Sequence, residues 1–590
     1  MTAGKLILRS LRFHWRSHLG VLVGATLAAA ILVGALAVGD CVRYSLREMA
    51  LARLGRVHLA LHGRDRFFRQ ELAAEVAGEL QAPVEPAILL AGAAAAPGGE
   101  ARANRVQVAG VRAGFWTMSS GGAPPGASSA WSGDQVILNE RLAAKLKARP
   151  GDEVILRIEK PSLLSRDAPL STIQDATTTL RVKVAAVAND RQFGRFGLEA
   201  NQIPPYNAFV PLELLQAQID LGGRANTLLV GGPEAGPPAA PAAANAALAR
   251  RWRLADAALR IEERSATAEL ELRTDRIFLE PAIGAALRNS APGGRGILTY
   301  FVNELRAGER STPYSTVAAV EGSPLPPSLQ DDEAVIHPWL AEDLGVRAGD
   351  RLTLKYFVVG PLRQLEEKSA GFRIKAVLPP GGPAADPTLM PDFPGVAEAD
   401  NCRDWEPGIR VDLSRIRDKD EAYWDRYRGT PKVFLTLKAG QALWNNRFGN
   451  LTAVRYPTGV QSRDGLEACL RQALSPAAIG LFVVPVREQA LAAGAASMDF
   501  GQLFVGFSLF LIVAALLLMA LLFTLGVEQR AEEVGALLAV GFPLRRVQRL
   551  LLLEGGALAL LGTLVGTALA AGYTRLVLAG LSTVWKDAVT

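Results

Sequence analysis

Residues 503–525 read LFVGFSLFLIVAALLLMALLFTL, twenty-three consecutive positions without a charged side chain. A helix rises about 1.5 Å per residue, so ~20 such residues cross the ~30 Å hydrocarbon layer of a bilayer. A second run, residues 19–38, is also uncharged, and a third begins at Leu550 and stays uncharged from Gly555 to Thr574. We therefore predict an α-helical integral membrane protein with three spans, at residues 19–39, 503–525 and 550–574.

The first run has an alternative interpretation as a cleaved signal peptide. Basic residues precede it, and Ala35-Leu36-Ala37 resembles a cleavage site. The apolar region of a signal peptide usually has about 7–15 residues, and this run is longer. The two later runs also keep the chain in the membrane, so we favour a spanning helix.

Basic residues set the predicted orientation. Four of them and no acid precede the first run, which places the N-terminus in the cytoplasm under the positive-inside rule. Residues 1–18 read as an amphipathic segment on the inner membrane surface, with Arg9 and Arg12 on one helical face and Leu8 and Leu11 on another. The same topology puts residues 526–549 inside the cell, and residues 40–500 and the tail 575–590 outside it. We expect a protein of the cell (inner) membrane whose net charge of +6 reflects arginines flanking the spans rather than nucleic-acid binding.

The outer region, residues 40–500, reads as an α+β domain with an internal duplication. A Pro/Ala/Gly-rich linker at residues 231–241 separates copies near residues 130–190 and 330–380. Each copy reads as strand, short helix, Gly-Asp turn and two more strands, and from Leu142 to Leu156 and from Leu340 to Leu354 the offset is a constant 198 positions (340 − 142). We interpret Asp152 and Asp350 as turn residues rather than catalytic acids, because Asp bonds to neighbouring backbone beside a turn glycine.

Motifs for chemistry are absent from the sequence, and we predict no catalytic, cofactor-binding or metal site in this chain. His58 and His62 are four residues apart, but no Glu lies between them as the HExxH zinc motif requires. The cysteines Cys41, Cys402 and Cys469 are too far apart for a CxxC site, although Cys402 and Cys469 have the option of a disulfide outside the cell. No phosphate-binding GxxxxGK[ST] loop occurs, so we do not expect the chain to hydrolyse a nucleotide itself.

The predicted cytoplasmic loop, residues 526–549, reads as two helices joined by a bend. Val527, Ala531, Val534 and Leu538 recur at helical spacing, with Glu528 and Glu532 on a neighbouring face. Gly541 is suited to end this helix, and Pro543 to begin the next. A plain connector does not need two defined helices, so we interpret the loop as an elbow on which a partner docks.

This part of the chain resembles a known family. The residues that carry the resemblance are Glu532, Gly535, Leu538-Ala539-Val540-Gly541, Val547, Glu554-Gly555, Gly562 and Gly566. They look like the FtsX-like domain of ABC transporter permeases of the MacB and LolC/LolE types, which have one span, a large external domain and then a block of further spans. Gly39-Asp40 and residues 207–212 also look like that family's external domain, the MacB-like periplasmic core.

The resemblance implies that the loop is a coupling helix seated in a separate ABC ATPase subunit, where ATP and Mg²⁺ would bind. Two permease chains, identical or homologous, and two ATPases would form the assembly, and ATP-driven closure would move the outer domains, a mechanism called mechanotransmission. The expected coupling residues supply charges and apolar anchors for the partner. They are Glu528, Arg530, Glu532, Glu533, Val534, Leu538, Gly541, Phe542, Pro543, Arg545 and Arg546.

Two small-residue motifs predict close helix packing within the membrane, Gly20-x-x-x-Gly24 and Gly562-x-x-x-Gly566. The FtsX-like block of relatives has a further span, so residues 503–590 read as an incomplete permease domain: a fragment, a truncated product or half of a split permease. The alternative function is a signalling receptor whose outer domain binds a ligand; an adjoining ATPase gene would favour the permease, and a kinase gene the receptor. The substrate stays open.

Overall fold

The computed structural model describes residues 3–127, 131, 133–161, 177–199, 203–232, 237–265, 267–360, 364–379, 381, 385–406, 411–496 and 500–583. The chain forms two compact units. The membrane unit consists of Met1–Leu54, Gly197–Pro204 and Arg487–Thr590. The outer unit consists of Gly55–Phe196 and Pro205–Val486.

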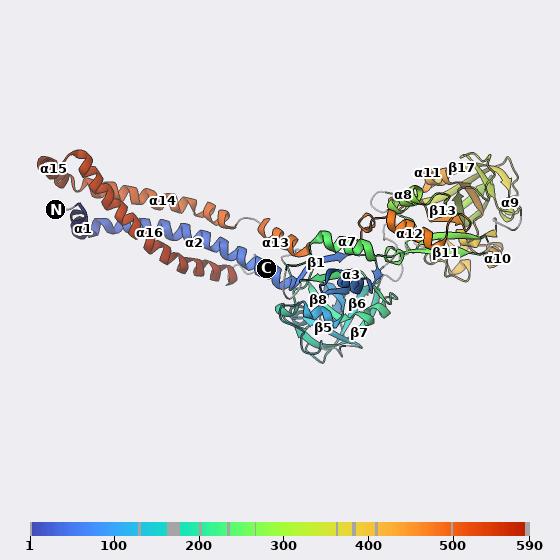
Figure 1. Ribbon diagram of the computed structural model, residues 1–590, viewed down its shortest axis with the longest axis horizontal. Helices are drawn as coiled ribbons and strands as arrows, with labels where there is room; N and C mark the ends of the chain where they lie inside the picture. The colour runs from blue at the N-terminus through green and yellow to red at the C-terminus, as the bar shows by residue number, and fades with distance from the viewer. Residues whose placement is uncertain are drawn as a thin grey trace. The chain divides into compact units, whose positions relative to one another are not determined.

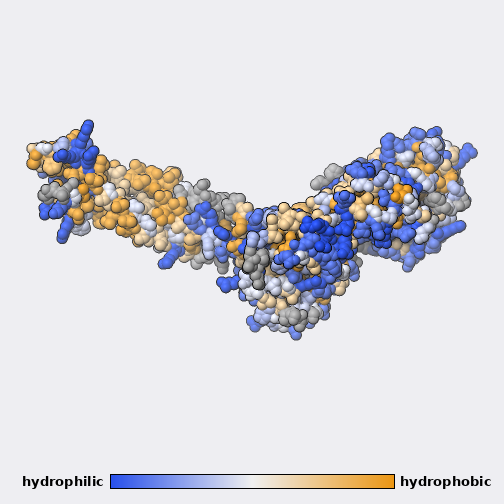
Figure 2. Space-filling model, in the orientation of Figure 1, coloured by the Kyte–Doolittle hydropathy of each residue, from blue (hydrophilic) through white to orange (hydrophobic). Residues whose placement is uncertain are grey.

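The membrane unit is built from helices, and three of them, α2, α14 and α16, are long and apolar enough to cross a membrane. The helices are α1 (Ala3–Phe13), α2 (Trp15–Leu54), α13 (Val486–Ala496), α14 (Phe500–Glu528), α15 (Ala531–Ala539) and α16 (Leu544–Thr583). Helix α2 packs against both α14 and α16 (Figure 1). Hydrophobic residues cover these helices, and hydrophilic residues gather at the end that carries α1 and α15 (Figure 2). The predicted three-span membrane protein is confirmed.

Two of the long helices extend beyond the predicted spans. Helix α2 continues to Leu54, because residues 40–54 contain neither Gly nor Pro to end it. Gly55 follows with φ +51°, a left-handed conformation that ends helices. Helix α16 continues to Thr583, so residues 575–583 of the predicted tail are helical. The predicted amphipathic segment is divided at His14, between α1 and α2.

The outer unit contains two β-barrels of six strands each. The first barrel consists of β3 (Val84–Ala95), β4 (Arg102–Val111), β5 (Gln135–Asn139), β6 (Glu153–Glu159), β7 (Thr177–Ala188) and β8 (Tyr206–Pro211). The second consists of β13 (Arg295–Ala307), β14 (Arg310–Val320), β15 (Glu333–Ile336), β16 (Arg351–Val359), β17 (Leu365–Val377) and β18 (Val433–Thr436). Pairing of β3 with β6, and of β13 with β16, closes each ring.

Further strands extend each sheet, and helices cover the barrels. The sheet of the first barrel also contains β1 (Val57–His62) and β10 (Thr227–Gly231). The sheet of the second barrel also contains β11 (Leu259–Arg264), β12 (Glu269–Thr274) and β19 (Ala453–Pro457). A separate two-stranded sheet is formed by β2 (Phe68–Arg69) and β9 (Arg224–Ala225). The helices are α3 (Leu72–Leu80), α4 (Ala113–Thr117), α5 (Glu140–Leu146), α6 (Leu212–Gln218), α7 (Pro241–Arg251), α8 (Pro281–Ser290), α9 (Pro338–Leu344), α10 (Asp418–Tyr427), α11 (Leu437–Trp444) and α12 (Arg463–Ala473).

The predicted duplication is confirmed and covers both barrels entirely. Corresponding strands pair in the same order, and β5–β7 and β15–β17 are parallel pairs with a bulge at matching positions, after Val136 and after Ala334. The helix that follows β5 or β15 is capped by a side chain in each copy. Asn139 accepts a hydrogen bond from Leu142 N at the start of α5, and His337 accepts one from Trp339 N at the start of α9. The second copy has a longer connection between its last two strands, from β17 to β18, and α10 lies within it.

The Gly-Asp turns have the predicted structural role. Gly151 and Gly349 have φ near +100°, which favours glycine. The side chain of Asp152 accepts from Arg149 N at 2.8 Å, and that of Asp350 accepts from Arg347 N at 2.8 Å. Each turn thus positions the next barrel strand through local hydrogen bonds.

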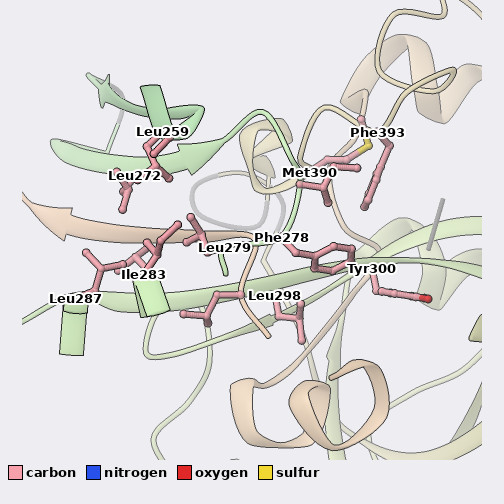
Figure 3. Packing of buried hydrophobic residues seen from close by; sticks show 14 of the residues in the cluster. Leu259, Leu272, Phe278, Leu279, Ile283, Leu287, Leu298, Tyr300, Met390 and Phe393 are labelled. Carbon is pink, nitrogen blue, oxygen red and sulfur yellow. The ribbon is translucent and has the colours of Figure 1, made fainter. Parts of the chain in front are cut away.

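Alternating strand residues form the barrel cores. In β6, Val154, Leu156 and Ile158 are fully buried, whereas the residues between them are exposed or half-buried. Around the second barrel, Phe278, Leu279 and Ile283 pack together near Leu298 (Figure 3). The three cysteines are free thiols, so Cys402 and Cys469 are not joined in this structure.

Candidate functional site

The predicted cytoplasmic loop forms a short helix, α15, between two bends. At its end, Gly541 has φ +93°, and Phe542 N donates to Leu537 O at 3.1 Å, which closes the helix. Pro543 directly precedes α16. The helix predicted from Val527 to Leu538 is interrupted, however, because α14 ends at Glu528 and α15 begins at Ala531. The turn between them lets the side chain of Arg530 bond within the bundle.

Helix α15 has no buried residue, and most of the predicted coupling side chains are exposed. Glu528, Glu532, Glu533, Leu538, Gly541, Pro543, Arg545 and Arg546 are exposed, and Arg530, Val534 and Phe542 are half-buried. Within the described part of the chain, Glu528, Glu532, Arg545 and Arg546 have no ion-pair partner. The exposed charges and apolar groups therefore share one region that is open to a partner.

Arg530 differs from the other predicted coupling residues, because it belongs to a network of polar side chains within the bundle. Its Nη1 donates to both carboxylate oxygens of Glu554 at 3.1 Å, and its Nη2 donates to Ser10 Oγ at 2.7 Å. Ser10 Oγ donates to Glu554 Oε1 at 2.8 Å, and His18 Nε2 lies 2.7 Å from the same oxygen. Glu554 is 3% exposed, so its charge is neutralised by these neighbours rather than by water.

The network extends to α15 through Glu533. Arg530 Nε donates to Glu533 Oε2 at 3.1 Å, and His14 Nε2 lies 2.9 Å from Glu533 Oε1. The set therefore joins α1, α2, α15 and α16 at one end of the bundle. Sequence reasoning missed it, although Glu554 is the only acid between Glu533 and Asp587, and an ionisable residue in a spanning helix needs a partner.

The small-residue motifs lie at helix contacts. A Cβ added at Gly20 or Gly24 of α2 would meet Leu522 or Met519 of α14, at 2.8 and 3.1 Å. A Cβ at Gly562 of α16 would lie 2.6 Å from Ala25 Cβ of α2, and one at Gly566 would lie 2.8 Å from Ala29 Cβ. The two motifs therefore place α2 against both of its neighbours.

Two protein families match the sequence. Residues 19–251 match the MacB-like periplasmic core domain, and residues 505–588 match the FtsX-like permease C-terminal domain. The chain is an FtsX/MacB-like permease of the ABC transporter class. The permease has membrane spans and a large periplasmic or extracellular domain. The match to the MacB-like periplasmic core domain ends at residue 251, before the second barrel begins.

Three solved structures are similar to part of the permease. The periplasmic region of MacB from Actinobacillus actinomycetemcomitans is 14% identical and covers 34% of this chain and 84% of its own, with a TM-score of 0.23. The extracellular domain of the noncanonic ABC-type transporter YknZ from Gram-positive bacteria is 13% identical, with coverages of 30% and 84% and a TM-score of 0.20. A domain of a putative permease protein from Porphyromonas gingivalis is 11% identical, with coverages of 34% and 84% and a TM-score of 0.22. A search of curated proteins found no match.

Proposed function

We propose that this permease couples ATP hydrolysis in a separate ABC ATPase subunit to movement of its own outer domain. ATP and Mg²⁺ would bind in the ATPase. Helix α15 would be the coupling helix, with Arg545 and Arg546 at the start of α16 beside it. Two permease chains and two ATPases would form the working assembly.

The observation that carries this proposal is the combination of an exposed helix with a buried attachment. Helix α15 has no buried residue, yet Glu533 and Arg530 tie it and its preceding turn to Ser10, His14 and Glu554. A force on the exposed face of α15 would therefore reach α1, α2 and α16 through polar contacts, without first deforming a flexible loop.

Helix α2 offers a direct route from this network to the outer unit. It is a continuous helix of 40 residues that begins at Trp15, beside the network, and ends at Leu54, one residue before the outer unit begins. At its outer end Arg53 is buried and donates to the backbone oxygen of Glu199. A continuous helix transmits displacement along its axis better than a chain of short elements, so mechanotransmission through α2 follows from the proposal.

Co-purification with an ABC ATPase encoded beside this chain tests the proposal. We expect the double reversal Arg545→Glu and Arg546→Glu to weaken the complex, because both arginines are exposed and have no ion-pair partner among the described residues. The matched control is Arg102→Glu with Arg105→Glu, which makes the same charge change on the outer unit and should leave the complex intact. A complex that survives both the loop reversal and deletion of residues 528–549 would show that α15 is not the coupling element.

A further inference from the structure

An open groove of about 780 Å³ lies between α1 and α15. Helix α1 contributes Arg9, Arg12 and Phe13 to its lining, and the α15 region contributes Ala536, Leu537 and Val540. The α1 side of the groove therefore carries two arginines beside the apolar Leu6 and Phe13, and the α15 side carries apolar residues beside the charged Arg530 and Glu533. Figure 2 shows hydrophilic residues gathered at this end of the bundle.

The two arginines of α1 are available to a ligand. Both are exposed, and neither has a carboxylate partner among the residues that the structure describes. The other charged groups at the groove are already engaged, since Arg530 bonds to Glu554 and Glu533 contacts His14. The groove thus offers two uncompensated guanidinium groups, which bind phosphate oxygens well.

The depth of the groove matches the lipid headgroup layer. The uncharged stretch of α2 begins at Leu19, and His14 lies five residues before it. At about 1.5 Å per residue this is roughly 7 Å beyond the hydrocarbon boundary, and the headgroup layer is about 5–8 Å thick on each side. Phe13 and Val540 are each 79% exposed, and a lipid bound in the groove would cover these apolar side chains.

We propose that this groove binds the headgroup of an anionic phospholipid of the inner leaflet. Arg9 and Arg12 would hold the phosphate, and the apolar wall formed by Leu537 and Val540 would contact the first methylenes of an acyl chain. The bound lipid would brace α1 against α15. The proposal requires that the groove lie at the cytoplasmic membrane surface, but it does not require an ATPase.

The test uses the full chain in nanodiscs of phosphatidylcholine with or without phosphatidylglycerol, with bound lipid counted by native mass spectrometry. We expect the wild-type chain to retain phosphatidylglycerol in preference to phosphatidylcholine. Loss of both charges in Arg9→Gln with Arg12→Gln should lower that retention roughly 10- to 30-fold, because each guanidinium that hydrogen-bonds directly to the phosphate contributes about fivefold. Arg9→Lys with Arg12→Lys should retain most of the binding.

The matched control is Lys5→Gln with Arg16→Gln, which removes the same two charges from the same segment. Neither residue lines the groove, and Arg16 instead lies over the Trp15 ring at 5.6 Å. Equal loss in both double variants, or no preference for phosphatidylglycerol, would overturn the proposal. Displacement of the lipid by inorganic phosphate would point to a free-anion site instead. Loss of ATPase association in the Arg9/Arg12 variant, without any lipid preference, would identify the groove as a protein docking site and also overturn the proposal.

Discussion

Replacement of Gly566 by alanine offers a direct test of the packing between α2 and α16. A Cβ at this position would contact Thr26 O, and it would lie 2.8 Å from Ala29 Cβ and 3.1 Å from Ala30 N. Thr26 O and Ala30 N belong to the α2 backbone, so they cannot be moved out of the way by a change of side-chain rotamer. Because carbon atoms pack at about 3.5–4.0 Å, the helices must separate by several tenths of an ångström or more.

The same helix supplies controls. A Cβ at Gly572 or Gly556 of α16 would have nothing within 4 Å. Alanine is favoured over glycine in a helix by about 0.8–1.0 kcal/mol, and this gain is common to Gly556, Gly562, Gly566 and Gly572. The difference between Gly566→Ala and Gly572→Ala therefore isolates the cost of overpacking, which is typically about 1–3 kcal/mol. Gly562→Ala, whose Cβ would meet Ala25 Cβ at 2.6 Å, should behave like Gly566→Ala.

The assay is unfolding of the full chain in detergent micelles, followed by circular dichroism during titration with a denaturing detergent. Gly556→Ala and Gly572→Ala should be as stable as the wild-type chain or slightly more stable. Gly562→Ala and Gly566→Ala should unfold at lower denaturant. If Gly566→Ala is as stable as Gly572→Ala, then α16 does not pack on α2 at this position, and the reasoning fails.

Two further predictions concern buried charge and pH. Glu554→Gln leaves Arg530 and His18 without their carboxylate, and should lower the free energy of unfolding by about 1–3 kcal/mol in the same assay; the exposed Glu528→Gln should change it by less than about 0.5 kcal/mol, and equal effects would contradict a structural role for the network. In the outer unit, burial and the nearby Lys432 charge lower the pKa of His337 to about 4, so the stability gained from its neutral form is complete above about pH 6.5 and is lost as the pH falls towards 4. The melting temperature of the wild-type chain should therefore fall more between pH 7.5 and pH 5 than that of His337→Asn, which keeps an acceptor for Trp339 N but cannot titrate; parallel decreases would refute this assignment.

Local signals made much of the fold predictable. The spans follow from the length of their uncharged runs, and the ends of α15 follow from Gly541 and Pro543, whose backbone preferences act within a few residues. The duplication is visible in the sequence because Leu142 and Gly151-Asp152 recur as Leu340 and Gly349-Asp350 at one offset of 198 positions. Its full extent is not, because the remaining strands of the two barrels share no such motif.

The amino-acid sequence by itself determined which segments enter the membrane, where α15 ends and how the Gly-Asp turns fold, because these depend on composition and on neighbours along the chain. Only the tertiary structure decided which strands close each barrel, since β3 and β6 pair across about 60 residues of intervening chain. It also turned Arg530 towards Glu554 and Ser10, the latter 520 positions away, and so made an expected partner-facing residue part of an internal network. Such contacts depend on which helices pack together, and helix packing in a membrane is set by shape and polar pairing between segments that are far apart in the sequence.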